Sequence, residues 1–251
     1  MVEPIADADF APCLSLVQDL DLIGRPASSS VCPAVERPGD APWENIVDNK
    51  TVSNISISCW RQKHPTGVYT YRTVGKAPFP AKRWIQVMND LEYRKTWDAY
   101  ATDLDVVETL PDGTDLVYWQ VKYPFFLSNR DYLYRRKTKQ FTVPVTGRRA
   151  ESAGSASAPL TYACVGDIPR SLVESPPVQY VAKAKPVRVD TYLGHALVQA
   201  DPEDPHSCRF GLIALDDPKL NIPKSLLNWA VSKAVPASMK MIHDACANYP
   251  T

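Results

Sequence analysis

Apolar and polar positions alternate most clearly along the segment Leu116–Tyr123. Its residues divide into two sets, with Val117, Trp119, Val121 and Tyr123 in one and Tyr118, Gln120 and Lys122 in the other. Side chains of a β-strand point alternately to its two sides, so this period of two is typical of a strand with unlike faces. The pattern predicts a strand here.

Other parts of the chain carry the β-branched and aromatic residues that strands favour. The predicted strands are Asn54–Trp60, Val68–Val74, Asp103–Leu110, Asp131–Val143, Leu160–Gly166, Val187–Gln199 and Ser207–Leu215. Turn signals such as Pro111-Asp112-Gly113 and Ser128-Asn129 lie between neighbouring strands. Consecutive strands joined by tight turns predict an antiparallel sheet.

Three segments have helical periodicity instead. Asp9–Leu22 places apolar residues at helical spacing and predicts a short amphipathic helix. A second helix starts at Pro80, where the first helical turn tolerates a residue without an N–H group. The third runs from Pro223 to Tyr249, and we expect Pro236 inside it to kink or divide the helix.

Two stretches rich in small, polar or proline residues predict loops, Gly24–Pro42 and Gly147–Pro159. The first separates an N-terminal helix plus loop, residues 1–42, from the main domain, residues 43–251. The order helix, strands, helix, many strands and long helix favours an α+β fold, in which a curved sheet encloses the terminal helix.

Composition narrows the class of function. The 28 basic and 28 acidic residues give a net charge of zero, which argues against a general nucleic-acid binder. The chain has no apolar run long enough for a spanning helix and no signal-peptide pattern at its N-terminus. Six scattered cysteines without a CxxC pair suit neither a zinc site nor a small disulfide scaffold. We therefore expect a cytoplasmic monomer with reduced thiols.

The common catalytic and cofactor motifs are absent from the sequence. HExxH, GxSxG, GxxxxGK[ST] and GxGxxG do not occur, and two of the four histidines stand beside prolines. These absences leave open an enzyme whose site assembles from residues far apart in the chain. No recognisable catalytic or metal-binding constellation is present, and we expect a protein that is not an enzyme and that has no cofactor and no metal site.

Aromatic residues crowd into the segment 118–134, and their role has two interpretations. They are Tyr118, Trp119, Tyr123, Phe125, Phe126, Tyr132 and Tyr134. Aromatic side chains commonly fill protein cores. They also form cages for quaternary ammonium groups, which cannot donate hydrogen bonds and are bound by the negative faces of rings.

Arg94 and Asp98 also have two interpretations, because they lie one turn apart in a predicted helix. A solvated ion pair would contribute little energy. A buried guanidinium would instead need an anion, and a lipid phosphodiester offers one in bidentate geometry while Asp98 holds the arginine.

Three segments carry a family resemblance: YRKTWDAY at Tyr93–Tyr100, VYWQVKYPFFLSNRDYLYRR at Val117–Arg136, and IPKSLLNWAVSKAVPASMKMIHDACANY at Ile222–Tyr249. They resemble START-type lipid-transfer domains, in particular the family of phosphatidylcholine transfer proteins, from about Trp43 to the C-terminus. The resemblance implies a helix-grip fold, in which a curved antiparallel sheet wraps a C-terminal helix around a hydrophobic tunnel that holds one phospholipid.

The resemblance also implies roles for individual residues. By motif position, Arg94 and Asp98 handle the lipid phosphate. Trp119, Tyr132 and, through the motif VRVDTY, Tyr192 form the choline cage.

Five residues are expected to line the pocket or belong to the lid: Met88, Phe79, Leu226, Trp229 and Met239. The chain departs from the family at three positions. Met88 stands in place of a phosphate-contacting tyrosine, Gly194 in place of a glutamine, and Phe79 where a small residue is common. These departures bear on the exclusive choice of phosphatidylcholine more than on lipid binding itself.

The expected function is therefore to bind one phosphatidylcholine-like phospholipid and to transfer it between membranes. The terminal helix would swing out as a lid during transient peripheral contact with a membrane. One alternative is a lipid sensor that does not transfer lipid but signals to a protein partner, through the loops 24–42 and 147–159. The other is a helix-grip hydrolase, for which His195 is the candidate acid or base.

Overall fold

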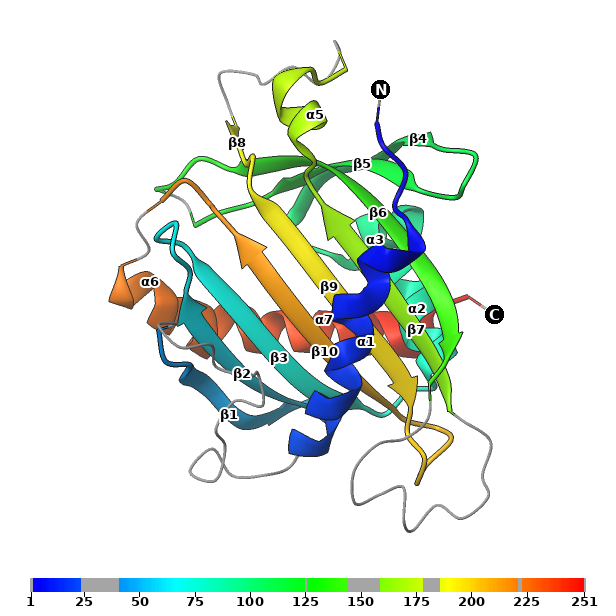
Figure 1. The fold of residues 1–251 in the computed structure, drawn as a ribbon. Helices are drawn as coiled ribbons and strands as arrows, with labels where there is room; N and C mark the ends of the chain where they lie inside the picture. The colour runs from blue at the N-terminus through cyan, green and yellow to red at the C-terminus, as the bar shows by residue number, and fades with distance from the viewer. Residues whose placement is uncertain are drawn as a thin grey trace.

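A single antiparallel sheet dominates the structure, a computed structural model that describes residues 2–23, 41–124, 126–143, 159–177, 186–220 and 223–250. Its strands are β1 (Glu44–Val52), β2 (Ile55–Lys63), β3 (Tyr69–Ala77), β4 (Ala101–Thr109), β5 (Asp115–Val121), β6 (Arg130–Thr142), β7 (Leu160–Asp167), β8 (Val187–Arg188), β9 (Tyr192–Ala200) and β10 (Cys208–Asp216). They lie in the order β1-β2-β3-β10-β9-β7-β6-β5-β4, and β8 pairs with β6. The sheet curves around the C-terminal helix, as the predicted α+β helix-grip fold requires (Figure 1).

The register of β5 and β6 confirms the alternation that the sequence predicts. Trp119 pairs with Tyr132 and Val117 with Tyr134, so all four side chains point to the concave face. Tyr118 points the other way, into a separate buried cluster on the convex side. The two faces of this strand pair therefore have different surroundings: one faces the terminal helix, and the other faces the outer layer.

The predicted N-terminal helix is a succession of short helical turns. These are η1 (Asp7–Phe10), α1 (Ala11–Ser15) and η2 (Leu16–Leu22), and they cross the convex face of the sheet (Figure 1). Phe10 and Leu16 are fully buried against the sheet, and the Arg72 Nε atom donates to Asp19 Oδ2 at 2.6 Å. Residues 2–23 thus share a core with the main domain. The predicted loop 24–42 lies outside the described residues except for its last two positions.

The helix expected from Pro80 onward is two helices, α2 (Ala81–Asn89) and α3 (Leu91–Trp97). They are separated at Asp90, whose side chain accepts a hydrogen bond from the backbone N–H of Tyr93 at 2.9 Å. A capping carboxylate satisfies an N–H that has no partner inside the helix, so α3 begins at this point. Trp84 of α2 stacks on Phe210 of the sheet at 4.9 Å and fixes the pair of helices on the concave side.

The C-terminal helix is continuous but irregular. It consists of α6 (Lys224–Trp229), the π-helical turn η5 (Ala230–Ala234) and α7 (Val235–Asn248). The expected disturbance at Pro236 is located just before the proline, which stands in the first turn of α7. A π-helical turn contains an extra residue per turn and is often found at functional sites.

One further prediction differs from the structure. The predicted strand Val187–Gln199 is two strands: β8 pairs with β6 in parallel, and β9 lies between β10 and β7. The short helix α5 (Arg170–Glu174) and the strand β1 were not predicted. The predicted loop 147–159 lies outside the described residues except for Pro159. Within the described segments, no helix is long and apolar enough to span a membrane.

Candidate functional site

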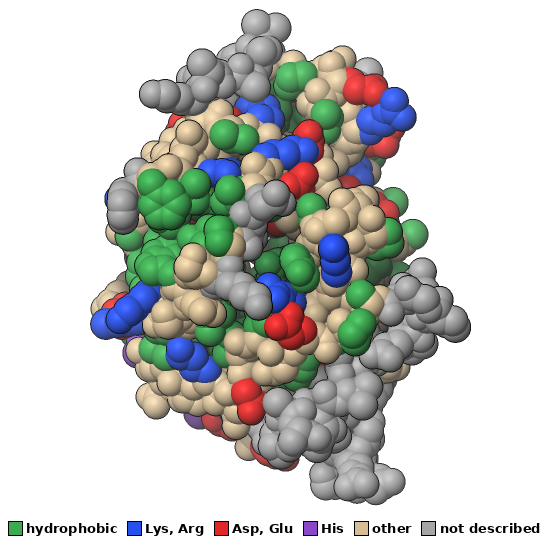
Figure 2. Space-filling view, turned by 90° about the vertical axis from the view of Figure 1, so that its left-hand side faces the viewer, with side chains coloured by type: hydrophobic (Ala, Val, Ile, Leu, Met, Phe, Trp, Pro, Cys, Tyr) green, Lys and Arg blue, Asp and Glu red, His purple; other side chains and the backbone are tan. Residues whose placement is uncertain are grey.

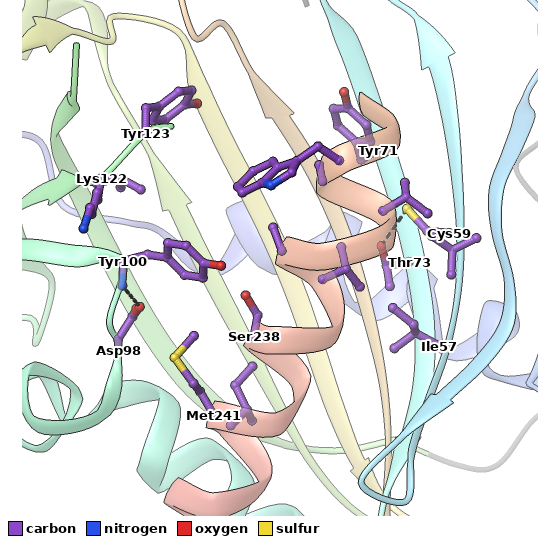
Figure 3. Close-up of a pocket in the computed structure, with 18 of the residues that line it drawn as sticks. Ile57, Cys59, Tyr71, Thr73, Asp98, Tyr100, Lys122, Tyr123, Ser238 and Met241 are labelled. Carbon is purple, nitrogen blue, oxygen red and sulfur yellow. Dashed lines mark hydrogen bonds between the residues drawn. The ribbon is translucent and has the colours of Figure 1, made fainter. Parts of the chain in front are cut away.

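A cavity of about 580 Å³ lies between the concave face of the sheet and the C-terminal helix. Ile57, Cys59, Tyr71 and Thr73 contribute from β2 and β3, on one side of the helix in Figure 3. The opposite wall comes from α3, β5 and the segment after each, with Asp98, Tyr100, Lys122 and Tyr123 visible in Figure 3. Apolar residues of the helix, including Leu227, Val235 and Ile242, line the space between. Its size and mostly apolar wall are typical of a ligand site.

The ion pair of Arg94 and Asp98 is part of this cavity wall. The Arg94 Nε atom lies 2.9 Å from Asp98 Oδ2, and the two side chains are 17% and 8% exposed. Asp98 follows directly after α3, and its other oxygen accepts the backbone N–H of Tyr100 at 3.0 Å. This pair is therefore largely withdrawn from water, which disfavours the interpretation as a solvated surface ion pair.

The guanidinium of Arg94 also lies over two indole rings. Its central carbon is 5.0 Å from the ring centre of Trp119 and 5.9 Å from that of Trp97. Both rings line the cavity, and the Nε1 atoms of both are buried without a hydrogen-bond partner among the described residues. Cation and aromatic faces thus lie side by side on one wall.

The three predicted cage residues form a continuous series of ring contacts. Trp119 and Tyr132 are 5.2 Å apart between ring centres, and Tyr132 meets Tyr192 edge-on at 5.7 Å. Trp119 lines the cavity, whereas Tyr132 is only 3% exposed and is packed behind it. The series therefore runs from the cavity wall into the sheet.

The departure at Gly194 has a steric explanation. A Cβ atom at this position would lie 2.8 Å from the hydroxyl of Tyr192, so a side chain there would displace the Tyr192 ring. Gly166 lies beside it on β7 and also faces the rings of Tyr134 and Tyr192. The two glycines leave the space in which Tyr192 reaches the other aromatic residues.

An acidic residue that the sequence analysis missed adjoins this aromatic series. Asp216 ends β10, and its Oδ2 atom accepts a hydrogen bond from the hydroxyl of Tyr132 at 2.9 Å. Burial raises the pKa of Asp216 to about 6, and burial also raises the pKa of Tyr132 well above its usual range. The available signal was the alternation along the predicted strand Ser207–Leu215. Continued by one residue, it places position 216 on the concave face.

The predicted pocket and lid residues divide into two groups. Met88, Leu226 and Trp229 line the cavity. Phe79 and Met239 do not: Phe79 packs edge-on against His243 at 5.3 Å, and Met239 is 5% exposed within the buried cluster around α2. These two residues attach the helix to the core instead of shaping the cavity. Tyr71, Tyr100 and Tyr123 also line the cavity. Tyr123 was part of the aromatic segment 118–134, but none of the three had been assigned to the pocket.

His195, the candidate acid or base of the hydrolase alternative, lies on the opposite side of the sheet. It pairs with Ile213 on β10, whose side chain packs with the N-terminal segment, and burial lowers its pKa. It therefore does not reach the cavity. Within the described ranges, no three His, Cys, Asp or Glu side chains are grouped so that they could hold a metal ion.

The C-terminal helix is attached much more firmly at one end than at the other. Near its C-terminus, the Tyr249 hydroxyl donates to Asp90 at 2.9 Å, the Tyr93 hydroxyl donates to the Ala245 carbonyl at 3.0 Å, and Arg83 donates to two further backbone carbonyls. Near its N-terminus, the Lys50 Nζ atom donates to the Val231 carbonyl in η5 at 3.1 Å. The α6 end is thus the end that is easier to release.

A second hollow of about 350 Å³ adjoins the cavity at this end and shares Pro124, Leu226 and Trp229 with it. Phe126, on its rim, is 68% exposed and Trp229 is 40% exposed. In Figure 2, which shows the side of the molecule that carries α6, hydrophobic side chains gather beside a hollow. Large apolar side chains exposed together mark a contact surface.

Known proteins resemble this chain in sequence and in fold. Residues 40–251 match the model of the START domain family. The chain is 31% identical to the phosphatidylcholine transfer protein of mouse over 221 residues, covering 87% of this chain and 91% of that protein. It is 26% identical to the mouse mitochondrial StAR-related lipid transfer protein 7, covering 82% of this chain and 49% of that protein. The crystal structure of human STARD10 superimposes with a TM-score of 0.62 at 21% identity, covering 99% of this chain and 82% of that one. The chain therefore belongs to the START domain family of lipid-binding proteins.

Proposed function

We propose that this protein binds one phosphatidylcholine-like phospholipid in its cavity and transfers it between membranes. The observation that carries this proposal is the apolar cavity with a buried Arg94–Asp98 pair beside an aromatic wall. The name of the mouse relative supports the same ligand class.

In this proposal, Arg94 binds the lipid phosphate. A guanidinium matches a phosphodiester in bidentate geometry, and such charge-assisted hydrogen bonds are stronger than neutral ones. Asp98 would keep the arginine oriented through the 2.9 Å contact. Because Asp98 is also held by the Tyr100 N–H, it stays in place when Arg94 turns toward the phosphate.

The choline group would contact Trp119 first, because this ring lines the cavity. Tyr132 and Tyr192 would complete the cage after a side-chain adjustment, since they are packed behind Trp119. Each ring contact with a desolvated cation contributes about 1–2 kcal/mol.

Lipid entry would require movement of the helix. A phospholipid with two acyl chains is larger than the ligands that cavities of this size usually enclose. Its chains would use the adjoining hollow or displace α6 and η5, which are held by fewer polar contacts than the other end of α7. Both the bilayer and the cavity are apolar, so the hydrophobic free energy of the chains changes little and transfer needs no energy source.

The exposed pair Phe126 and Trp229 would make the transient contact with the membrane. Both lie at the mouth through which a lipid would enter, and aromatic side chains are favoured at the membrane–water interface. We propose that Phe126→Ser weakens adsorption to vesicles but leaves the affinity for a short-chain phosphatidylcholine in solution unchanged.

The decisive experiment measures lipid content and transfer on the same preparation. Native mass spectrometry should identify one unaltered phosphatidylcholine per protein, and labelled phosphatidylcholine should move between vesicles. Arg94→Ala and Trp119→Ala should each slow transfer. Bound lipid without transfer would favour a lipid sensor, and chemically altered lipid would favour a hydrolase.

A further inference from the structure

Asp216 occupies an unusual position for a carboxylate. It pairs with Tyr192 on β9 and Tyr69 on β3, so it points to the concave face beside the aromatic series. Its Oδ2 atom accepts the Tyr132 hydroxyl at 2.9 Å. Its Oδ1 atom is buried and accepts no hydrogen bond from any described residue. A buried carboxylate oxygen without a donor is costly, and such costs are usually kept where they serve a function.

Arg130, whose charge acts on Asp216, does not relieve this cost by a hydrogen bond to Oδ1. Arg130 lowers the pKa of Asp216 only as a minor effect, because burial dominates. The guanidinium is bonded elsewhere, with Nε donating to the Pro218 carbonyl at 2.8 Å and Nη1 to the Ser128 carbonyl at 2.6 Å. It also lies 4.4 Å from the ring centre of Tyr123. The negative charge of Asp216 is thus directed at the tyrosines.

We propose that Asp216 is a positioning residue that sets the preference of the cavity for lipids with a cationic headgroup, by holding the hydroxyl of Tyr132 and placing a negative charge behind the aromatic series. This proposal rests on the proposed function.

The physical basis is the electron density of the rings. A phenol that donates a hydrogen bond to a carboxylate has a more electron-rich ring, which attracts a cation over its face more strongly. The carboxylate itself also attracts the cation at longer range, and this attraction is strong because the surroundings are buried. A quaternary ammonium benefits from both effects without donating a hydrogen bond. A headgroup without a cation benefits from neither.

The test compares Asp216→Asn with the matched control Asp217→Asn. Asparagine keeps the shape and a carbonyl oxygen for Tyr132 but removes the charge. Asp217 is the adjacent acid, and its side chain is paired with Lys219 at 3.1 Å. Affinities are measured for phosphatidylcholine and for phosphatidylglycerol with the same acyl chains, which has the phosphate but no cation.

We expect Asp216→Asn to weaken phosphatidylcholine binding by about five- to tenfold, the effect of roughly one aromatic–cation contact, and to leave phosphatidylglycerol binding unchanged. Asp217→Asn should change neither affinity. Because the fold disfavours the ionised form of Asp216, Asp216→Asn should not melt below the wild type at pH 7.5. If the role of Asp216 is only structural, Asp216→Asn should lower the melting temperature and weaken the binding of both lipids equally. That result would overturn the proposal.

A pH series on the wild type tests the same idea without a variant. The groups that face Asp216 are Tyr132 and Arg130 from β6, Tyr192 from β9, Tyr69 and Tyr71 from β3, Tyr123 after β5, and the adjacent Asp217. Tyrosine side chains remain neutral and arginine remains charged between pH 5 and 7.5.

The pKa of Asp216 is about 6, so its charge is present at pH 7.5 and is largely lost at pH 5. The ratio of phosphatidylcholine to phosphatidylglycerol affinity should therefore fall several-fold as the pH falls through 6, and Asp216→Asn should abolish this dependence. A ratio that stays constant in the wild type would refute the role of Asp216. If the wild type binds neither lipid at any pH, it is the proposed function that fails.

Discussion

The Arg94–Asp98 pair provides a test that separates folding from ligand binding. Arg94→Ala leaves a carboxylate that is 8% exposed without its counter-charge. Removing one partner of a fully buried ion pair costs about 3–5 kcal/mol. Asp98 keeps the hydrogen bond from the Tyr100 N–H, so we expect a loss of about 2 kcal/mol. In a chain of this length that corresponds to a fall of about 5 °C in the melting temperature.

The double variant Arg94→Met, Asp98→Asn removes both charges and replaces them with neutral groups of similar size. Neutral replacement of a buried pair is often close to neutral for stability, so most of the loss should be recovered. Binding should not be recovered, because the phosphate loses its charge-assisted hydrogen bonds. These contribute about 1.5–3 kcal/mol, which corresponds to roughly 10- to 150-fold in affinity.

The measurements are urea unfolding for stability and transfer of fluorescent phosphatidylcholine between vesicles for binding. We expect Arg94→Ala to have a lower free energy of unfolding than the wild type and to transfer lipid more slowly. We expect the double variant to have nearly the wild-type free energy of unfolding and still to transfer lipid more slowly. A stable double variant that transfers lipid at the wild-type rate would refute the phosphate role of Arg94. A double variant as unstable as the single variant would refute the electrostatic account of the pair.

Substitutions at three other contacts of the helix and the aromatic series should have smaller effects on stability, transfer or affinity. Lys50→Met removes the hydrogen bond to η5, so hydrogen exchange of the backbone amides in residues 224–234 should accelerate. Lipid transfer between vesicles should rise a few-fold, and the free energy of unfolding should fall by about 1 kcal/mol or less. Unchanged amide exchange in these residues would contradict this prediction. Tyr249→Phe removes a hydrogen bond at the anchored end of α7 and should cost about 1 kcal/mol of unfolding free energy without changing lipid affinity; a change in affinity would show that this end moves too. Gly194→Ala places a methyl group 2.8 Å from the Tyr192 hydroxyl and should weaken phosphatidylcholine binding several-fold. If the variant binds phosphatidylcholine as tightly as the wild type, Tyr192 is not part of the cage.

Sequence periodicity predicted most of the strands, because it depends only on local geometry. It did not predict β1, and it joined β8 and β9 into one strand. The alternation along Leu116–Tyr123 identified the face that carries Trp119, and the registers of β5 and β6 agree with it. The terminal helix was equally visible, since an amphipathic stripe of this length has few alternative structures. The resemblance at Tyr93–Tyr100 and Val117–Arg136 supplied the family, because both segments are long and distinctive.

Tertiary structure alone decided which side chains meet. Asp216 is 84 positions after Tyr132 in the chain, and no local pattern signals that one accepts a hydrogen bond from the other. The role of Gly194 also depends on a neighbour across space, the hydroxyl of Tyr192, and not on the turn or helix signals by which glycine is usually interpreted. Only the structure shows which face of β9 is the concave one, and His195 lies on the other face, opposite Ile213.

The apolar pattern also could not distinguish core from cavity. Met239 and Leu226 belong to the same hydrophobic stripe of the terminal helix, yet Met239 is in the core and Leu226 lines the cavity. Periodicity specifies which side of a helix avoids water. Whether that side meets packed side chains or an open space depends on how far the sheet curves away, and this distance results from the pairing of strands that are remote in the sequence.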